Sequence, residues 1–231
     1  MNFIGLDACK LGWCGIGLYD NTLIWDCYKN LDEVLKKHPN IQRILIDIPI
    51  GLSSINFSRT VDTQARTYLN KRKSSIFSPP CREALQAKTY KEALAINRQI
   101  CKKGISIQAY NIGSKIKAVD QWLEHKPETI QVFEAHPELC FKTLNNNCDL
   151  KYSKHDKAGL DDRLEILLRH NKILEFIYQD ILKQFKRYEV KRDDILDAMA
   201  LFLIQSFSKL KYFEDNNNID ETGKRVRIVY G

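Results

Sequence analysis

The sequence predicts an α/β fold, and three observations support this. Short segments rich in β-branched and aromatic residues come first, at residues 2–7, 13–19 and 23–28. A continuous apolar run follows at residues 43–52, which is typical of a central strand covered on both faces. Helical periodicity dominates most of the remaining chain. Strands and helices of this kind, in 231 residues, indicate a single α/β domain.

The first three strand segments are expected to pair as an antiparallel meander. Gly12 and the Asp20 and Asn21 pair mark the tight turns between them. A brief amphipathic helix is expected next over residues 31–37, before Pro39.

Residues 58–126 are interpreted as a basic helical insertion after the fourth strand. From Arg59 to Lys126 the chain has 14 lysines and arginines against five acids, a local charge of +9 within a total of +7. Such a segment suits a phosphate-backbone partner, but it is also what a solvated lysine-rich surface looks like. Helices are expected at about residues 60–70, 81–87, 89–102 and 113–125, with the proline-containing stretch KRKSSIFSPPC irregular.

The C-terminal part is expected to supply one more strand and several helices. The strand lies in TIQVFEAHPEL, and a long helical stretch follows in which residues from Leu164 to Phe185 share one apolar face. The helix in KRDDILDAMALFLIQSF is apolar almost all round, which predicts burial. TGKRVRIVYG is expected as an edge strand, and the asparagine runs at residues 145–147 and 216–218 as loops.

Composition narrows the functional classes. No apolar run approaches the roughly 20 residues that span a bilayer, and the first residues do not have the pattern of a signal peptide. The seven cysteines are an odd number without a C-x-x-C pair, which argues against a disulfide framework or a zinc site. We therefore expect a cytoplasmic protein without a membrane partner.

Acidic residues recur where apolar elements end. Asp7, Asp47 and Glu134 each come at the carboxyl end of an apolar strand, where ligands bind in open α/β sheets. Asp194 and Asp197 are three residues apart and share one face of the last helix. Two carboxylates about 4 Å apart repel by roughly 4 kcal/mol at an effective dielectric of 20. If these acids converge, hard divalent ions, Mg²⁺ or Mn²⁺, are the expected partners.

Each acid also has a structural alternative. Asp194, or Asp193 before it, can cap the last helix, and Asp47 can accept a turn amide. Glu134 can pair with a lysine at the end of the sheet. The apolar neighbours of Asp7 and Asp197 make a purely structural role harder to explain for these two.

Five motifs, in order along the chain, resemble one known family. GLDACKLGW, IDIPIGL, SSIFSPPCREAL, FEAHPELCF and DDILDAMAL are similar to the successive motifs of the domain of unknown function 429 family, which is described as predicted RNase H-like nucleases. The resemblance runs from Asn2 to about Leu203. It implies an RNase H-like core, a mixed five-stranded sheet flanked by helices, with the helical insertion after strand 4.

The resemblance also implies a set of metal ligands. Asp7 matches the metal-binding aspartate of strand one in this superfamily. Asp47 takes the place of the acid after strand four in resolvase-type (RuvC-like) enzymes, and Asp194 and Asp197 reproduce their D-x-x-D pair. Glu134 takes the place of the acid after strand five in a related (YqgF-like) branch. Which of Asp47 and Glu134 binds metal stays open.

Several basic residues are secondary candidates. Lys10 lies in the turn beside Asp7, and Lys154 in a polar loop; either could meet a phosphate or be solvated. His136 could move protons, although HPE also reads as a helix start with Pro at the first position. In the basic segment, Arg72, Lys73 and Arg82 are candidates for nucleic-acid binding.

The leading functional hypothesis is a divalent-metal-dependent nuclease acting on DNA or RNA. A non-catalytic nucleic-acid-binding or scaffold protein on the same core is the alternative. Phosphoryl transfer from a nucleotide, as in the actin and sugar-kinase group, is disfavoured because the first turn reads DACKLGW and no second copy of the core is present.

Overall fold

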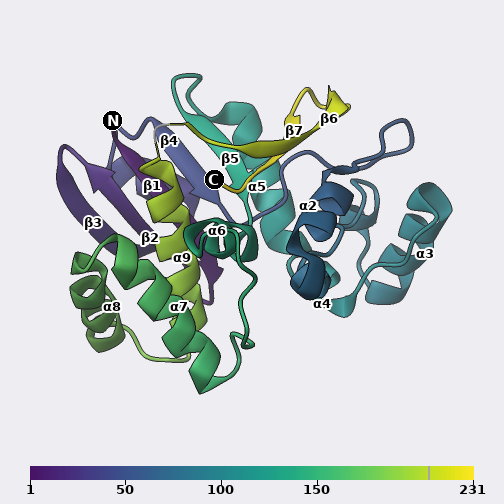
Figure 1. Ribbon diagram of the computed structural model, residues 1–231. Helices are drawn as coiled ribbons and strands as arrows, with labels where there is room; N and C mark the ends of the chain where they lie inside the picture. Colours follow the sequence, from purple (N-terminus) through teal and green to yellow (C-terminus); the bar gives the residue numbers. More distant parts are fainter. Residues whose placement is uncertain (208) are drawn as a thin grey trace. The chain divides into compact units, whose positions relative to one another are not determined.

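The chain folds into two compact units in the computed structural model, which describes residues 1–207 and 209–231 (Figure 1). The first unit comprises Met1–Asp47, Pro127–Tyr212 and Val229–Gly231. The second comprises Ile48–Lys126 and Phe213–Ile228. The basic segment at residues 58–126 therefore lies wholly in the second unit, together with the ten residues before it and most of a C-terminal hairpin.

The first unit is a sheet with helices. Its elements in chain order are β1 (Phe3–Cys9), β2 (Gly12–Tyr19), β3 (Thr22–Tyr28), α1 (Leu31–Lys37), β4 (Arg43–Ile46), β5 (Gln131–Ala135), α6 (Pro137–Leu144), α7 (Lys157–His170), α8 (Ile173–Gln184) and α9 (Arg192–Gln205). The predicted α/β class is confirmed.

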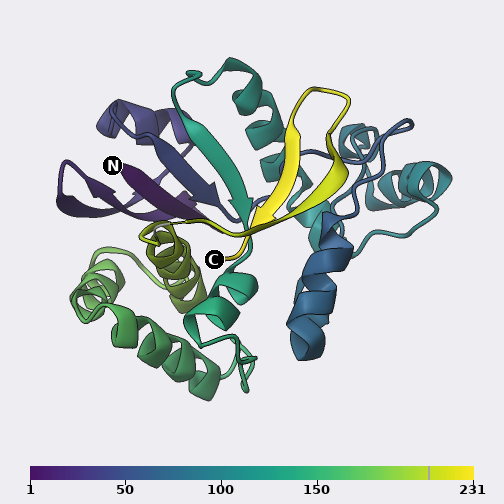
Figure 2. The same cartoon turned by 45° about the horizontal axis from the view of Figure 1, so that its top comes forward.

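The strands of the first unit run in the order β3-β2-β1-β4-β5, which places β1 between β2 and β4 (Figure 2). β1 pairs antiparallel with β2, and β2 pairs antiparallel with β3, so the expected meander is present. β1 and β4 are parallel, as are β4 and β5. The sheet is therefore mixed.

Helix α9 packs directly on β1, and its contact with the strand depends on one glycine. A Cβ atom added to Gly5 would lie 2.6 Å from the backbone nitrogen of Phe202, too close for any other residue. On the same face the rings of Phe3 and Phe202 stack with centroids 5.7 Å apart. Helices α6, α7 and α8 then pack around α9 (Figure 1). This close contact brings the acidic first turns of α9 toward Asp7 in β1.

The second unit is helical with one hairpin. Its elements are α2 (Val61–Leu69), the 3₁₀ helices η1 (Asn70–Ser75) and η2 (Ala84–Gln86), α3 (Tyr90–Cys101), α4 (Ile107–Asn111), α5 (Gly113–His125), and the neighbouring strands β6 (Tyr212–Ile219) and β7 (Arg225–Val229), of which Tyr212 and Val229 belong to the first unit.

The apolar run at residues 43–52 forms a much shorter strand than the sequence suggests. β4 ends at Ile46, and Pro49 has no amide hydrogen for a strand ladder. Gly51 has a φ of +75°, a left-handed conformation that favours glycine. Residues after Ile46 are apolar because they are buried in a loop: Ile48, Ile50 and Leu52 are all in the core.

The expected helix at residues 81–87 is reduced to the single 3₁₀ turn η2. The backbone amide of Cys81 donates to the side-chain oxygen of Asn97 at 2.8 Å, and the amide of Arg82 donates to the carbonyl of Ser53 at 2.9 Å. Tertiary partners therefore satisfy backbone groups that the local pattern assigns to a helix.

The C-terminal half differs from expectation in two further places. The helical stretch through residues 164–185 breaks into α7 and α8 at Asn171, whose side chain accepts the amide of Ile173 at 3.1 Å. Residues 216–218, expected as a loop, lie within β6, and neither β6 nor α4 was expected. Asparagine composition alone was a misleading loop signal.

In the parts of the chain that the structure describes, no helix combines the length and the apolar character needed to cross a bilayer.

Candidate functional site

Asp7 lies within β1, two residues before the strand ends, and is only 5% exposed. Its place in the strand alternation puts it on the face of Phe3 and Gly5, which is the face that α9 covers. Among the described residues, none donates a hydrogen bond to the Asp7 carboxylate or forms an ion pair with it. A buried acid without a partner is costly, so this carboxylate is the first sign of a functional site.

Asp47 is the residue directly after β4. Its backbone amide donates to the carbonyl of Leu6 at 3.0 Å, which extends the parallel pairing of β1 and β4 by one residue. Leu6 pairs with Ile46, so the next residues, Asp7 and Asp47, both turn to the opposite face of the sheet. This register brings the two acids side by side.

Asp194 and Asp197 approach from α9. Asp194 is the third residue of the helix, and its Oδ2 accepts the amide of Lys191 at 2.9 Å, so the helix-capping role is real. Asp197 lies one turn further along and is 2% exposed. Helix capping uses only one of the two carboxylate oxygens of Asp194. It does not explain why the acid Asp197 is buried in the helix.

The four acids interact electrostatically. Burial raises the pKa of Asp7 well above its usual value, and the charges of Asp197, Asp47 and Asp194 raise it further. Burial also raises the pKa of Asp194 to about 6, against the opposing effect of the Lys191 amide. The pKa of Asp197 is raised by burial, although Lys154 works in the opposite direction. The site thus has an excess of negative charge.

Lys154 is the basic side chain that pairs with this cluster. Its Nζ lies 2.8 Å from Oδ2 of Asp197 and 3.8 Å from Asp193. Asp197 raises the pKa of Lys154, and Asp7 and Asp47 contribute to the rise, so the ammonium stays charged inside the cluster. Among the described residues, Lys154 is the one cation with an ion pair to these four acids, so one ammonium faces four carboxyl groups. The sequence placed Lys154 in a polar loop but could not indicate which acid it would meet.

Glu134 lies in the same sheet but on its other face. It is buried in β5, and it pairs in register with Ile46, which pairs with Leu6. Strand alternation therefore turns Glu134 with Leu6 and Ile46, away from Asp7 and Asp47. The structure brings together four of the five candidate acids and places Glu134 apart from them.

The two remaining candidates of the first unit form no ion pair with the acids in the described part of the chain. Lys10 is exposed, and its Nζ lies 5.4 Å from the ring centroid of Tyr188. His136 is the residue before α6, with Pro137 at the first helical position, as the structural alternative predicted. Its Nδ1 is buried without a hydrogen-bond partner among the described residues.

A second buried ion pair supports the site from α6 and α7. Arg163 in α7 is fully buried and donates to Oε1 of Glu138 in α6. The negative charge of Glu138 contributes to the raised pKa of Asp197. Arg163 lies on the buried face of α7 with Gly159, Ile166 and Leu167, and this position among apolar residues was the available sequence signal for the pair.

The four acids fit a divalent ion by donor type and charge. All are carboxylates, which suit Mg²⁺ or Mn²⁺, and Asp7 has no competing hydrogen bond. Their spacing is not that of a formed ligand shell: within the described residues, no group of three or more His, Cys, Asp or Glu is arranged to hold a metal ion. Ion binding at Asp197 would require the ammonium of Lys154 to move.

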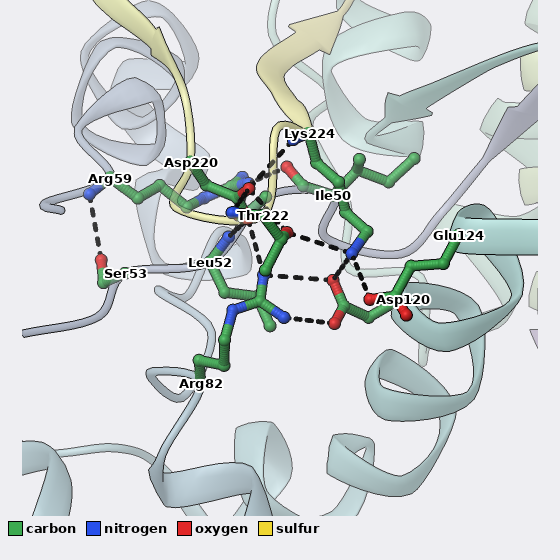
Figure 3. Close-up of polar contacts among 11 residues, drawn as sticks. Ile50, Leu52, Ser53, Arg59, Arg82, Asp120, Glu124, Asp220, Thr222 and Lys224 are labelled. Atoms are coloured by element: carbon green, nitrogen blue, oxygen red, sulfur yellow. Dashed lines mark hydrogen bonds and ion pairs between the residues drawn. The ribbon is translucent and has the colours of Figure 1, made fainter.

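The candidates for nucleic-acid binding lie in the second unit. Arg72 and Lys73 are in η1, and Lys73 is exposed. Arg82, by contrast, is held in an ionic network: it pairs with Asp120 and, at 2.6 Å, with Asp220, as Figure 3 shows. Its guanidinium is therefore already occupied by two carboxylates of the same unit.

The mixed sheet, the covering helix α9 and the buried carboxylate cluster define the class as an α/β protein with an acidic site on one face of the sheet. The profile of one family, described as protein of unknown function (DUF429), matches residues 5–207. The chain belongs to this DUF429 family. Searches of curated proteins and of solved structures find no significant match.

Proposed function

We propose that this protein is a divalent-metal-dependent nuclease built on an RNase H-like core. The observation that carries the proposal is the convergence of Asp7, Asp47, Asp194 and Asp197, from two strands and a helix, in a buried site with one paired lysine. The strand order β3-β2-β1-β4-β5, with its first three strands antiparallel, supports the core assignment.

The acids would act by holding the ions. Divalent ions held there would supply activation of a water molecule and neutralise charge on the departing oxygen of a phosphodiester. Asp7 is the best placed ligand because no side chain of the described chain competes for it. The backbone of Asp47 is fixed by its hydrogen bond to Leu6, and the side chain of Asp194 by its cap, so both residues have a defined place before any ion binds.

Lys154 would carry out a second task. Its ammonium lies in the carboxylate cluster and offsets part of its charge while no ion is present. Once Asp197 takes part in ion binding, the same ammonium would be available to contact a phosphate oxygen of the substrate. The charge of +9 in residues 59–126 would add a sequence-independent attraction that weakens with salt.

A non-catalytic nucleic-acid-binding protein on the same core is the second candidate. The observation that favours it is the 2.8 Å pairing of Lys154 with Asp197, which gives one of the four acids a partner within the protein. In this case the lysine would replace the ion permanently. Binding would occur without turnover.

The two candidates can be separated by a cleavage assay with Mg²⁺ or Mn²⁺. The substrates are branched DNA, single-stranded DNA and single-stranded RNA, and the proteins are the wild type, Asp7→Asn and the matched control Asp161→Asn, an exposed acid on α7. We expect wild-type cleavage, a loss of at least about 100-fold in Asp7→Asn, and a change below about 2-fold in the control.

Equal cleavage by the wild type and Asp7→Asn would rule out this mechanism. Salt-dependent binding by the wild type with no turnover in either metal would favour the non-catalytic alternative.

A further inference from the structure

A cavity of about 310 Å³ lies in the second unit, and it shares no lining residue with the carboxylate cluster. All of its lining residues come from the chain between Ser53 and Ser106, so its shape is set within that unit. A volume near 300 Å³ is at the lower end for sites that bind small organic molecules. Its lining combines basic side chains, serine hydroxyls and an apolar wall.

Arg66 is the central basic residue of the cavity. It lies in the last turn of α2, where its Nε donates to the carbonyl of Ile76 at 2.8 Å and its Nη2 to the hydroxyl of Ser78 at 3.1 Å. Both acceptors are neutral, and among the described residues Arg66 has no carboxylate partner. Its guanidinium is thus held in one orientation with its charge unbalanced.

Arg59, the other arginine of the lining, is different. Its guanidinium donates to both oxygens of Asp62, at 2.7–3.1 Å, and to the carbonyls of Ile50 and Gly51. Its backbone amide is tied to Ser53 (Figure 3). The charge of Arg59 is therefore balanced by Asp62, and its role in the cavity lining is structural. The charge of Arg66 is not balanced by a carboxylate of the described residues and is available to a ligand.

Lys103 adds a second unbalanced charge at the exposed rim. Buried Asn97 fixes this rim, because its side chain accepts the amide of Cys81 at 2.8 Å and donates to the carbonyl of Lys103 at 2.9 Å. With Arg59 paired to Asp62, Arg66 and Lys103 give the lining a net charge of +2. The hydroxyls of Ser58 and Ser78 lie in the same lining.

The apolar residues of the lining indicate which class of ligand the cavity can bind. Ile76, Phe77 and Pro79 line the cavity next to the basic groups. A fixed guanidinium with nearby hydroxyls suits an oxyanion with several acceptor atoms, of which phosphate is the best match. An aromatic ring next to such a group is the arrangement on which nucleobases stack.

We infer that this cavity binds the phosphate group of a nucleotide, either free or at the 5′ end of a nucleic-acid strand, through Arg66 and Lys103. Arg66 contacts the phosphate oxygens, Lys103 adds attraction at the rim, and Phe77 contacts the base. This site is separate from the carboxylate cluster and does not need a metal ion.

The test is a binding measurement in EDTA. Calorimetry uses AMP, with adenosine as the uncharged control. Fluorescence anisotropy uses a labelled single-stranded oligonucleotide with a 5′-phosphate and the same strand with a 5′-hydroxyl. We expect saturable binding of AMP or of the 5′-phosphorylated strand, and much weaker binding of adenosine and of the 5′-hydroxyl strand. Binding of AMP alone identifies the free nucleotide as the source, and binding of the phosphorylated strand alone identifies the strand end.

Three variants locate the binding. Arg66→Gln should weaken it at least about 10-fold, since a charged hydrogen-bond donor is lost. Lys103→Gln should weaken it about 2- to 5-fold, and because Lys103 is exposed this variant keeps the fold. Arg98→Gln, an exposed arginine of α3 outside the lining, is the matched control and should change binding less than about 2-fold.

Two results would overturn the inference: no saturable binding of either phosphorylated probe, or binding that both Arg66→Gln and Lys103→Gln leave unchanged. Because the assay has no metal and measures no turnover, its outcome is independent of the proposed nuclease activity.

Discussion

Each of the two units contains a cluster of interacting charged side chains, and the two clusters differ in how far positive and negative charges balance. In the first unit, four carboxylates share a site with Lys154. In the second, Arg82 and Lys224 contact three acids, Asp120, Asp220 and Glu124 (Figure 3). Asp220 alone also accepts the amides of Leu52, Thr222 and Lys224, whereas Asp7 accepts none from any described residue.

The difference shows how a structural cluster can be told from a functional one. The acids around Arg82 have partners from the elements they join, so the network holds the β6–β7 turn to the helical part of the second unit. The acids around Asp7 raise one another's pKa values and make few bonds that stabilise the fold. A cluster that destabilises the folded chain is retained for another reason, and ligand binding is the direct one.

The largest effect is expected for Asp220→Ala. This change leaves Arg82 with one acid and removes the acceptor of the buried Leu52 amide and of the amides of Thr222 and Lys224, so we expect a loss of about 3–5 kcal/mol in the free energy of unfolding of the second unit. Hydrogen exchange followed by mass spectrometry, with peptides from each unit, measures it. Glu124→Ala is the matched control and should cost less than about 1 kcal/mol, because Glu124 is 48% exposed. Equal effects for the two variants would mean that the network is not the structural element described.

In contrast to Asp220→Ala, the Asp7→Asn change is expected to raise the free energy of unfolding. The amide removes a buried negative charge from among three others and can donate to their oxygens. We therefore expect the first unit to gain about 1–3 kcal/mol at neutral pH without metal, although the proposed nuclease activity is lost. Chemical denaturation combined with hydrogen exchange checks this, with Asp161→Asn as the neutral reference. A destabilisation of several kcal/mol would place Asp7 with the structural acids of the second unit.

The smallest expected effect is the change with pH in the contribution of Asp220 to the stability of the fold. Burial works to raise the pKa of Asp220, but hydrogen bonds from Thr222, Lys224 and Leu52 outweigh it and hold the pKa below its ordinary value of 3.8. An acid with a lowered folded pKa stabilises the fold above its unfolded pKa, and this contribution is lost as the pH falls through the folded pKa. The stability difference between wild type and Asp220→Ala should thus be constant above about pH 5 and shrink below about pH 4. A difference that grows on acidification would contradict the assigned direction.

Local patterns were informative where one periodicity dominated. The strands at residues 2–28 alternate with clear turn residues, and α1 and α5 match the ranges expected for them. The continuous apolar pattern of α9 predicted its burial, which the structure confirms. The apolar pattern gave a wrong prediction after Ile46, where the apolar residues are buried in a loop instead of a strand. It also missed the helix break at Asn171, a polar residue within a series that otherwise shares one apolar face.

For the site, the sequence by itself determined which acids interrupt apolar elements. An acidic residue at the end of an apolar strand or inside an apolar helix can be recognised from its sequence neighbours alone. Only the tertiary structure decided which of them meet. The register between β4 and β5 forms only in the folded sheet, so the sequence could not tell that Glu134 faces away from Asp7. The partners of Lys154, Arg66 and Arg82 come from elsewhere in the fold, and only folding shows which charges remain unbalanced.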